Sequence, residues 1–256
     1  MKNHGYIYSP RDPKDYVLGG VSFSPHEVLA IDGKWKNHLP APEKQLSDYF
    51  DTISCVSFTV CNAIEALMRR KFAIHSENSD RALAIASDTT KNGNTVTRVC
   101  EIARKILGFI PEEMLPFSKD IKSWEEYHSP NPLNKKYYDE GRIWLNKYIF
   151  QHEWVDTDPE SLKEGLKYSP LGVSVLAWIK SGDYYVKQKG DNDNHFTLLV
   201  GYEEGDHWLV YDTYPASDGV FYKKLSWDYP FGIVKSFSIK KAKQSWLLKW
   251  CTEILK

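Results

Sequence analysis

The sequence predicts an α+β protein whose helical first part packs against an antiparallel β-sheet formed by the second part. Three observations predict this class. Composition is globular, with 42% hydrophobic and 26% charged residues among 256. Helix-period apolar spacing dominates the first part, and short β-branched or aromatic runs follow residue 170. This segregated order disfavours an alternating βαβ sheet.

The chain divides into an extended arm and one folded domain. Residues 1–50 are rich in Pro, charge and turn residues, and we expect them to run over the surface as an arm. Residues 51–256 form the predicted domain, with a helical half to about residue 165 and a β half from about residue 166. The domain is long enough to bury most of its apolar surface without disulfides.

Four helices are predicted from apolar stripes and end signals. The first follows Ser54 and is apolar over much of its girth, so we expect it to be buried. The others are predicted over 95–107, from Asp158 with Pro159 at the first helical position, and near the C-terminus, where Leu247, Trp250, Cys251 and Ile254 share one face.

Five strands are predicted in the β half, where Gly, Asp, Ser or Pro interrupts each run. They cover residues 172–179, 196–202, 208–213, 220–225 and 232–239. Residues 203–206 read as a hairpin loop between the second and third of them.

Composition and motifs exclude several classes of protein. The net charge is −1 with no basic stripe, so nucleic acid is not an expected partner. The best apolar run is far shorter than the ~18 residues of a membrane span, and the N-terminus lacks the apolar region of a signal peptide. No HExxH, paired CxxC or Walker-type loop occurs, so we expect no metal and no cofactor.

Cys55 is the candidate nucleophile. It opens the central helix, where the positive end of the helix dipole favours the thiolate. The alternative is a small buried apolar residue, the commonest fate of a free cysteine. We expect Cys55 to be exposed in a cleft and to react faster than Cys61, Cys100 and Cys251, which fit structural positions better.

His195 and Asp212 are the candidate base and its orienting acid. His195 follows a turn and begins a predicted strand, and Asp212 interrupts an otherwise apolar one. A short hairpin joins the two strands, so the two side chains can lie side by side, with the carboxylate accepting the imidazole N–H. The alternatives are a solvated strand-end histidine and an aspartate that caps a turn.

Together these residues resemble the papain-like cysteine peptidases. The family's nucleophile segment appears as Ser54-Cys55-Val56-Ser57-Phe58, and Asn194-His195 follows 140 residues later (195 − 55), within the family's range of ~130–150. Asp212 takes the place of the family's Asn. The segment 11–16 resembles the arm of bacterial and phage members, and the resemblance extends to about Tyr214.

The resemblance implies a papain-like fold with the active-site cleft between the two halves. It implies that Gly93, Asn94, Val173 and Asn194 bind substrate. It also implies that a side chain before Cys55 stabilises the oxyanion. Tyr49 stands at the family's usual spacing, whereas Gln45 reaches the site only if residues 46–49 loop out. Aspartate instead of asparagine at position 212 implies more positive charge on the imidazole.

The function implied is hydrolysis of peptide bonds by a Cys-His-Asp thiolate mechanism, with a protein or peptide substrate and a monomeric enzyme. Only 54 residues precede Cys55, too few for the family's usual inhibitory propeptide, which indicates a cytoplasmic or virion-associated enzyme. Three alternatives stay open: a peptidoglycan amidase, an acyltransferase with the same triad, and a non-catalytic papain-fold binding protein.

Overall fold

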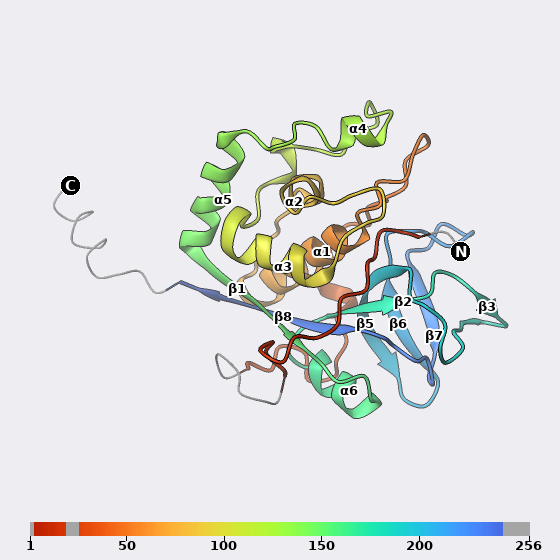
Figure 1. Ribbon diagram of the computed structural model, residues 1–256. Helices are drawn as coiled ribbons and strands as arrows, with labels where there is room; N and C mark the ends of the chain where they lie inside the picture. Colours follow the sequence, from red (N-terminus) through yellow and green to blue (C-terminus); the bar gives the residue numbers. More distant parts are fainter. Residues whose placement is uncertain (1–2, 19–25, 243–256) are drawn as a thin grey trace.

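The computed structural model describes residues 3–18 and 26–242 as an α+β molecule. In Figure 1 the helices α1–α5 gather on one side, and the strands of a single sheet extend from them toward the other. The helix predicted near the C-terminus, with Cys251, lies outside the described residues.

The helices are α1 (Cys55–Phe72), α2 (Asp80–Ala86), α3 (Val96–Ile102), α4 (Trp124–Tyr127), α5 (Lys135–Lys147) and α6 (Pro159–Leu166), with a π-helical turn at Ala103–Leu107 and short 3-10 turns at Lys36–His38 and Glu112–Met114. The prediction for 95–107 is confirmed as α3 and the π-helical turn that continues it. Asp158 caps α6 as predicted, accepting the Ser161 N–H at 3.0 Å.

The strands are β1 (Tyr148–Trp154), β2 (Leu171–Val175), β3 (Lys180–Ser181), β4 (Tyr184–Tyr185), β5 (His195–Glu203), β6 (His207–Tyr211), β7 (Tyr222–Ser226) and β8 (Val234–Lys241). They form one sheet in the order β1-β8-β2-β5-β6-β7-β4-β3. All neighbours are antiparallel except β4 and β7. The five predicted strands are confirmed as β2, β5, β6, β7 and β8.

One strand lies inside the stretch predicted as helical. β1 pairs with β8 along its whole length and forms an edge of the sheet. Polar residues Gln151, His152 and Glu153 occupy the second half of the strand, so its sequence lacks the apolar run typical of a buried strand.

Helix α1 joins the two halves. Every residue from Cys55 to Met68 is buried, as predicted from its apolar girth. The helix packs against β5 and β8, and Thr59 donates a hydrogen bond to the Phe196 carbonyl at 3.0 Å. The start of α1 is thereby fixed against the start of β5. In the part of the chain that the structure describes, no helix is long and apolar enough to cross a membrane.

Candidate active site

Cys55 begins α1 and is fully buried. The expectation that its thiol would be exposed in a cleft is therefore wrong for this conformation. Burial raises the pKa of the Cys55 thiol well above its ordinary value, and backbone hydrogen bonds from Phe196 and Val56 oppose this only in part. The hydrogen bond from Phe196 places the sulfur beside the start of β5. Burial therefore disfavours the thiolate in this conformation.

The turn before α1 is tied to the β half. Asp51 accepts the Ile53 N–H at 3.0 Å through Oδ1 and the Tyr214 hydroxyl at 2.6 Å through Oδ2. Ile53 adopts a left-handed conformation, with φ of 56°. Because Tyr214 belongs to the chain just after β6, this carboxylate fixes the approach to Cys55 relative to the strands that carry the base.

His195 and Asp212 form a direct, buried pair. His195 is the first residue of β5, and Asp212 directly follows β6, the antiparallel neighbour of β5. The His195 Nε2 lies 2.6 Å from Asp212 Oδ1, and both side chains are inaccessible to solvent. The other imidazole nitrogen, Nδ1, has no hydrogen-bond partner among the residues that the structure describes.

Asp212 is held as an anion by two partners. Burial by itself raises the pKa of this carboxyl, but the charges and hydrogen bonds of His195 and Lys223 outweigh burial and lower it below its usual range. Lys223 Nζ donates to Asp212 Oδ2 at 2.7 Å, and the Thr213 N–H donates to Oδ1 at 2.9 Å. Both carboxylate oxygens are therefore occupied.

Aromatic rings enclose the imidazole of His195. The ring centroid of Tyr214 lies 5.1 Å away, and that of Trp178 lies 5.7 Å away in an edge-on arrangement. His4, from the N-terminal arm, lies at 6.0 Å. These contacts exclude water from the pair, which strengthens its electrostatic interaction.

Gln45 lies at the site, and Tyr49 does not. The Gln45 side chain is fully buried, with Oε1 accepting the Thr213 hydroxyl at 2.7 Å. Tyr49 is 60% exposed, and its hydroxyl accepts a hydrogen bond from Lys122. Residues 46–51 loop out through a Leu46–Asp51 bridge, which absorbs the extra length before Cys55.

Residues 4–7 of the N-terminal arm cross the site. The His4 N–H donates to the Asn194 carbonyl at 2.9 Å. On the side of the helices, the backbone of Asn94 makes two hydrogen bonds to the segment. Its N–H donates to the Gly5 carbonyl at 3.0 Å, and its carbonyl accepts the Ile7 N–H at 2.9 Å. The N-terminal segment runs between the helices and the strands in Figure 1. It spans the space between the start of α3 and the start of β5.

The amide expected to bind an oxyanion instead holds a carbonyl of this segment. Gln45 Nε2 donates to the His4 carbonyl at 3.2 Å and to the Tyr214 hydroxyl at 2.7 Å. The next residue, Gly5, has a φ of 109°, and a Cβ there would lie 2.4 Å from the Ile53 carbonyl oxygen. The His4–Gly5 peptide group therefore fits tightly beside the turn that leads to Cys55.

Three of the four residues predicted to bind substrate contact this segment. Asn94 and Asn194 bond to its backbone, and a Cβ on Gly93 would lie 2.1 Å from the Gly5 carbonyl oxygen. Val173 is placed differently, in the middle of β2, where it is fully buried and paired with residues of β5 and β8.

Two residues at the site, Lys223 and His4, were not predicted from the sequence. Lys223 had a detectable signal. It lies two residues before Leu225 in a predicted strand, and residues two apart in a strand share the same face. His4 carries no such signal, since it lies in an extended arm without periodicity. Only the fold brings it to His195.

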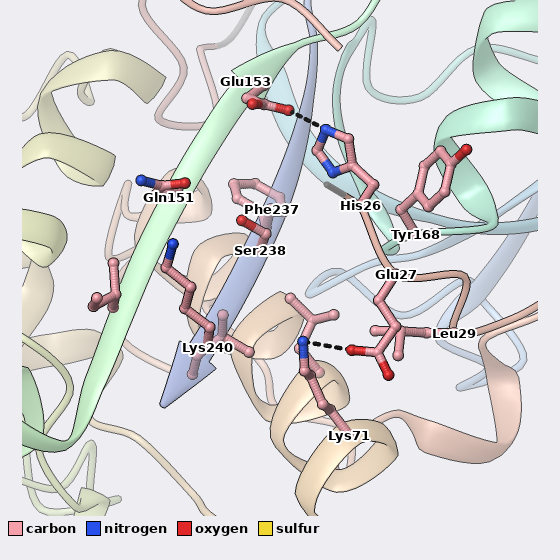
Figure 2. Close-up of a pocket in the computed structure, with 13 residues that line it drawn as sticks. His26, Glu27, Leu29, Lys71, Gln151, Glu153, Tyr168, Phe237, Ser238 and Lys240 are labelled. Carbon is pink, nitrogen blue, oxygen red and sulfur yellow. Dashed lines mark ion pairs between the residues drawn. The ribbon is translucent and has the colours of Figure 1, made fainter. Parts of the chain in front are cut away.

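A separate cavity lies between α1, β1, β8 and residues 26–29 of the arm (Figure 2). Two ion pairs lie on its wall, Lys71–Glu27 at 2.7 Å and His26–Glu153 at 3.0 Å. Its lining includes none of the candidate catalytic residues, so it is distinct from the site above. No cluster of three metal-ligating side chains occurs within residues 3–18 and 26–242.

Comparison with known proteins shows similarity of structure alone. No protein-family model and no curated protein matches the sequence. Digestive procathepsin L 3 of the Tenebrio molitor larval midgut superposes with a TM-score of 0.63 at 17% identity, covering 92% of this chain and 76% of that one. The clostridial cysteine protease Cwp84 after propeptide cleavage gives 0.63 at 15%, covering 80% of this chain and 56% of that one. The chain has the papain-like α+β fold that its sequence predicts.

Proposed function

We propose that this protein is a cysteine peptidase that hydrolyses peptide bonds with Cys55 as nucleophile. The buried contact of 2.6 Å between His195 and Asp212 carries the proposal, because it orients the imidazole and leaves Nδ1 without a partner. The hydrogen bond from Phe196 to the Cys55 thiol brings the nucleophile to the same strand end.

In the proposed reaction His195 transfers two protons, one from the thiol to the leaving amine and one from water to the sulfur. His195 Nδ1 takes the thiol proton of Cys55, and the thiolate attacks the carbonyl carbon of the scissile bond. The imidazolium then donates that proton to the leaving amine as the C–N bond breaks and the acyl enzyme forms. Water, deprotonated by His195, releases the acyl group and regenerates the thiol. Asp212 stays ionised throughout and orients the ring.

Gln45 is the proposed oxyanion donor, together with the Cys55 backbone N–H. The Gln45 amide already binds a peptide carbonyl, that of His4, at 3.2 Å. A substrate carbonyl at the same place would accept this bond as its oxygen gains negative charge. We expect Gln45→Ala to lower kcat by about 10²–10³ with little change in KM.

Activity requires residues 4–7 to leave the site. Cys55 is fully buried in this conformation, and the segment occupies Asn94, Asn194 and the Gln45 amide, which are the groups proposed to bind substrate. Its displacement rehydrates the thiol and removes the main cause of its raised pKa. The described conformation is therefore the closed form of the proposed enzyme.

A thiol-directed probe and a peptide library test the function together. Wild-type protein is expected to be labelled at Cys55 and to cleave a subset of peptides, whereas Cys55→Ala and His195→Ala abolish cleavage. Cys61→Ala, one buried thiol further along α1, is the matched control and should retain activity. Labelling of Cys55 without cleavage of any peptide favours acyl transfer or a non-peptide substrate instead.

A further inference from the structure

A buried lysine faces the candidate triad from β7. Lys223 is only 2% exposed, although Lys224 beside it is exposed. Its ammonium donates to Asp212 Oδ2 at 2.7 Å and also to the Tyr214 carbonyl. A lysine is rarely buried unless it is paired, so this contact is specific.

The Asp212 carboxylate lies between two nitrogen groups. Oδ1 contacts His195 Nε2 at 2.6 Å, and Oδ2 contacts Lys223 Nζ at 2.7 Å. Trp178 packs against both side chains that contact Asp212: the Lys223 ammonium lies 4.9 Å from its ring centroid, and the ring meets His195 edge-on. Carboxylate, lysine and histidine thus form one enclosed unit.

The charge of Lys223 changes what Asp212 does to the imidazole. A lone buried carboxylate would strongly favour the protonated form of His195. An ammonium on the other oxygen cancels much of that charge, so the pair orients the ring while acting on it as a nearly neutral group. The carboxylate is also prevented from rotating, since both of its oxygens are held.

Other charged or titratable groups surround this unit. Cys55 approaches from α1, His4 from the arm, and Asp51 through Tyr214. Lys187 and Asp193, in the loop before β5, pair with each other at 2.5 Å. Within the described residues, Lys223 is the cation that bonds directly to the carboxylate that orients His195.

We propose that Lys223 is a positioning residue that fixes and neutralises the Asp212 carboxylate, so that the aspartate–lysine pair orients His195 without over-stabilising its protonated form. This inference rests on the proposed function and concerns the same site. It replaces the expectation that aspartate at position 212 simply adds positive charge to the imidazole.

The test is a cycle of variants in the full-length protein, followed by pH profiles of kcat/KM. Lys223→Met should lower kcat/KM at least tenfold and move the alkaline limb to higher pH by about one unit, because the carboxylate is no longer compensated. Asp212→Asn should move that limb to lower pH, because a buried cation is left beside the imidazole. The double variant Asp212→Asn with Lys223→Met should return the limb to its native position and exceed Asp212→Asn in activity.

Lys224→Met is the matched control, since it removes the same charge from the exposed face of the same strand. It should leave both rate and profile unchanged. A native profile in Lys223→Met, or a double variant that keeps the limb of Asp212→Asn, would overturn the proposal. If Lys223→Met does not fold, the comparison of Asp212→Asn with the double variant decides between the same outcomes.

The rate of Cys55 alkylation against pH gives the same readout without any substrate. If no peptide is cleaved, the proposed function fails, while the alkylation profiles of these variants still report on Lys223. If peptides are cleaved and the profiles do not respond to Lys223→Met, the function stands and the role of Lys223 falls.

Discussion

Two parts of the N-terminal arm contact the same domain by different means. Residues 4–7 bind through backbone hydrogen bonds to Asn94 and Asn194 and through the ring of Tyr6. Farther along, Trp35 inserts its side chain into the core, is fully buried, and donates its indole N–H to the Leu166 carbonyl at 2.7 Å. One part lies on the candidate site, and the other is part of the domain interior.

The difference indicates which part can move. A backbone hydrogen bond contributes little net free energy, because water or another peptide can replace its partner. A buried indole has no such substitute, and its removal leaves a cavity. We therefore expect residues 4–7 to be a reversible cover over Cys55 and Trp35 to be a permanent anchor. Mutations in the two parts should separate activity from stability.

The largest expected effect is on the anchor. Trp35→Ala should lower the free energy of unfolding by about 3–5 kcal/mol, because it empties a fully buried site and removes the bond to Leu166. Urea denaturation measures this change. Asn37→Ala, two residues away and exposed, is the control and should change stability by less than about 0.5 kcal/mol. Equal effects of the two variants would show that the arm is not anchored through the core.

The next effect is on the cover. Gly5→Val places a branched side chain against the Ile53 carbonyl oxygen, which lies 2.4 Å from a Cβ at this position. The segment should leave the site, and iodoacetamide should label Cys55 about 100-fold faster, since a thiol reacts as its thiolate and only when accessible.

Gly190→Val is the matched control for this change. Gly190 has a similar φ of 100°, but no atom lies within 4 Å of a Cβ there, so the backbone strain is comparable and the steric conflict is absent. It should leave the labelling of Cys55 unchanged. Slow labelling in Gly5→Val would mean that the thiol is buried by the domain itself and not by the arm.

A smaller effect is expected from removal of the ring of Tyr6, the residue after Gly5. Tyr6 is buried and stacks on Phe196, with centroids 6.0 Å apart and an interplanar angle of 15°. An aromatic pair of this kind stabilises by about 0.5–1.5 kcal/mol beyond area burial, so Tyr6→Ala should raise the labelling rate of Cys55 about tenfold. Tyr8→Ala, whose ring is 66% exposed, should have no effect.

The sequence was sufficient to predict the fold class and the elements that place Cys55, His195 and Asp212. The helix that begins at Cys55 has a strong apolar pattern, and the strand of His195 contains a long apolar run, so local signals matched the final structure. The hairpin between β5 and β6 then determined which residues meet. The catalytic roles of these residues stay predictions until they are tested.

The cover over the site could not be predicted, because it depends on contacts between distant segments without periodicity. Residues 4–7 meet Asn94 and Asn194 through backbone groups, which every residue possesses and no sequence pattern marks. The same lack of a local signal is the reason why the expectation of an exposed thiol at Cys55 was wrong. The position of Cys55 at the start of α1 was predicted correctly, whereas its full burial was not.

The smallest effect is expected at the second cavity, where the arm contacts α1 through an ion pair. Glu27 and Lys71 lie 2.7 Å apart, but Glu27 is 60% exposed, so water already solvates much of its charge (Figure 2). An exposed pair contributes about 0–1 kcal/mol, and salt screens it. Glu27→Gln should therefore change the free energy of unfolding by less than about 1 kcal/mol and leave the labelling of Cys55 unchanged. Urea denaturation at low and high salt measures the first quantity, and alkylation measures the second. A loss as large as that of Trp35→Ala would contradict the comparison, because the arm would then be held by surface charge and not by its buried indole.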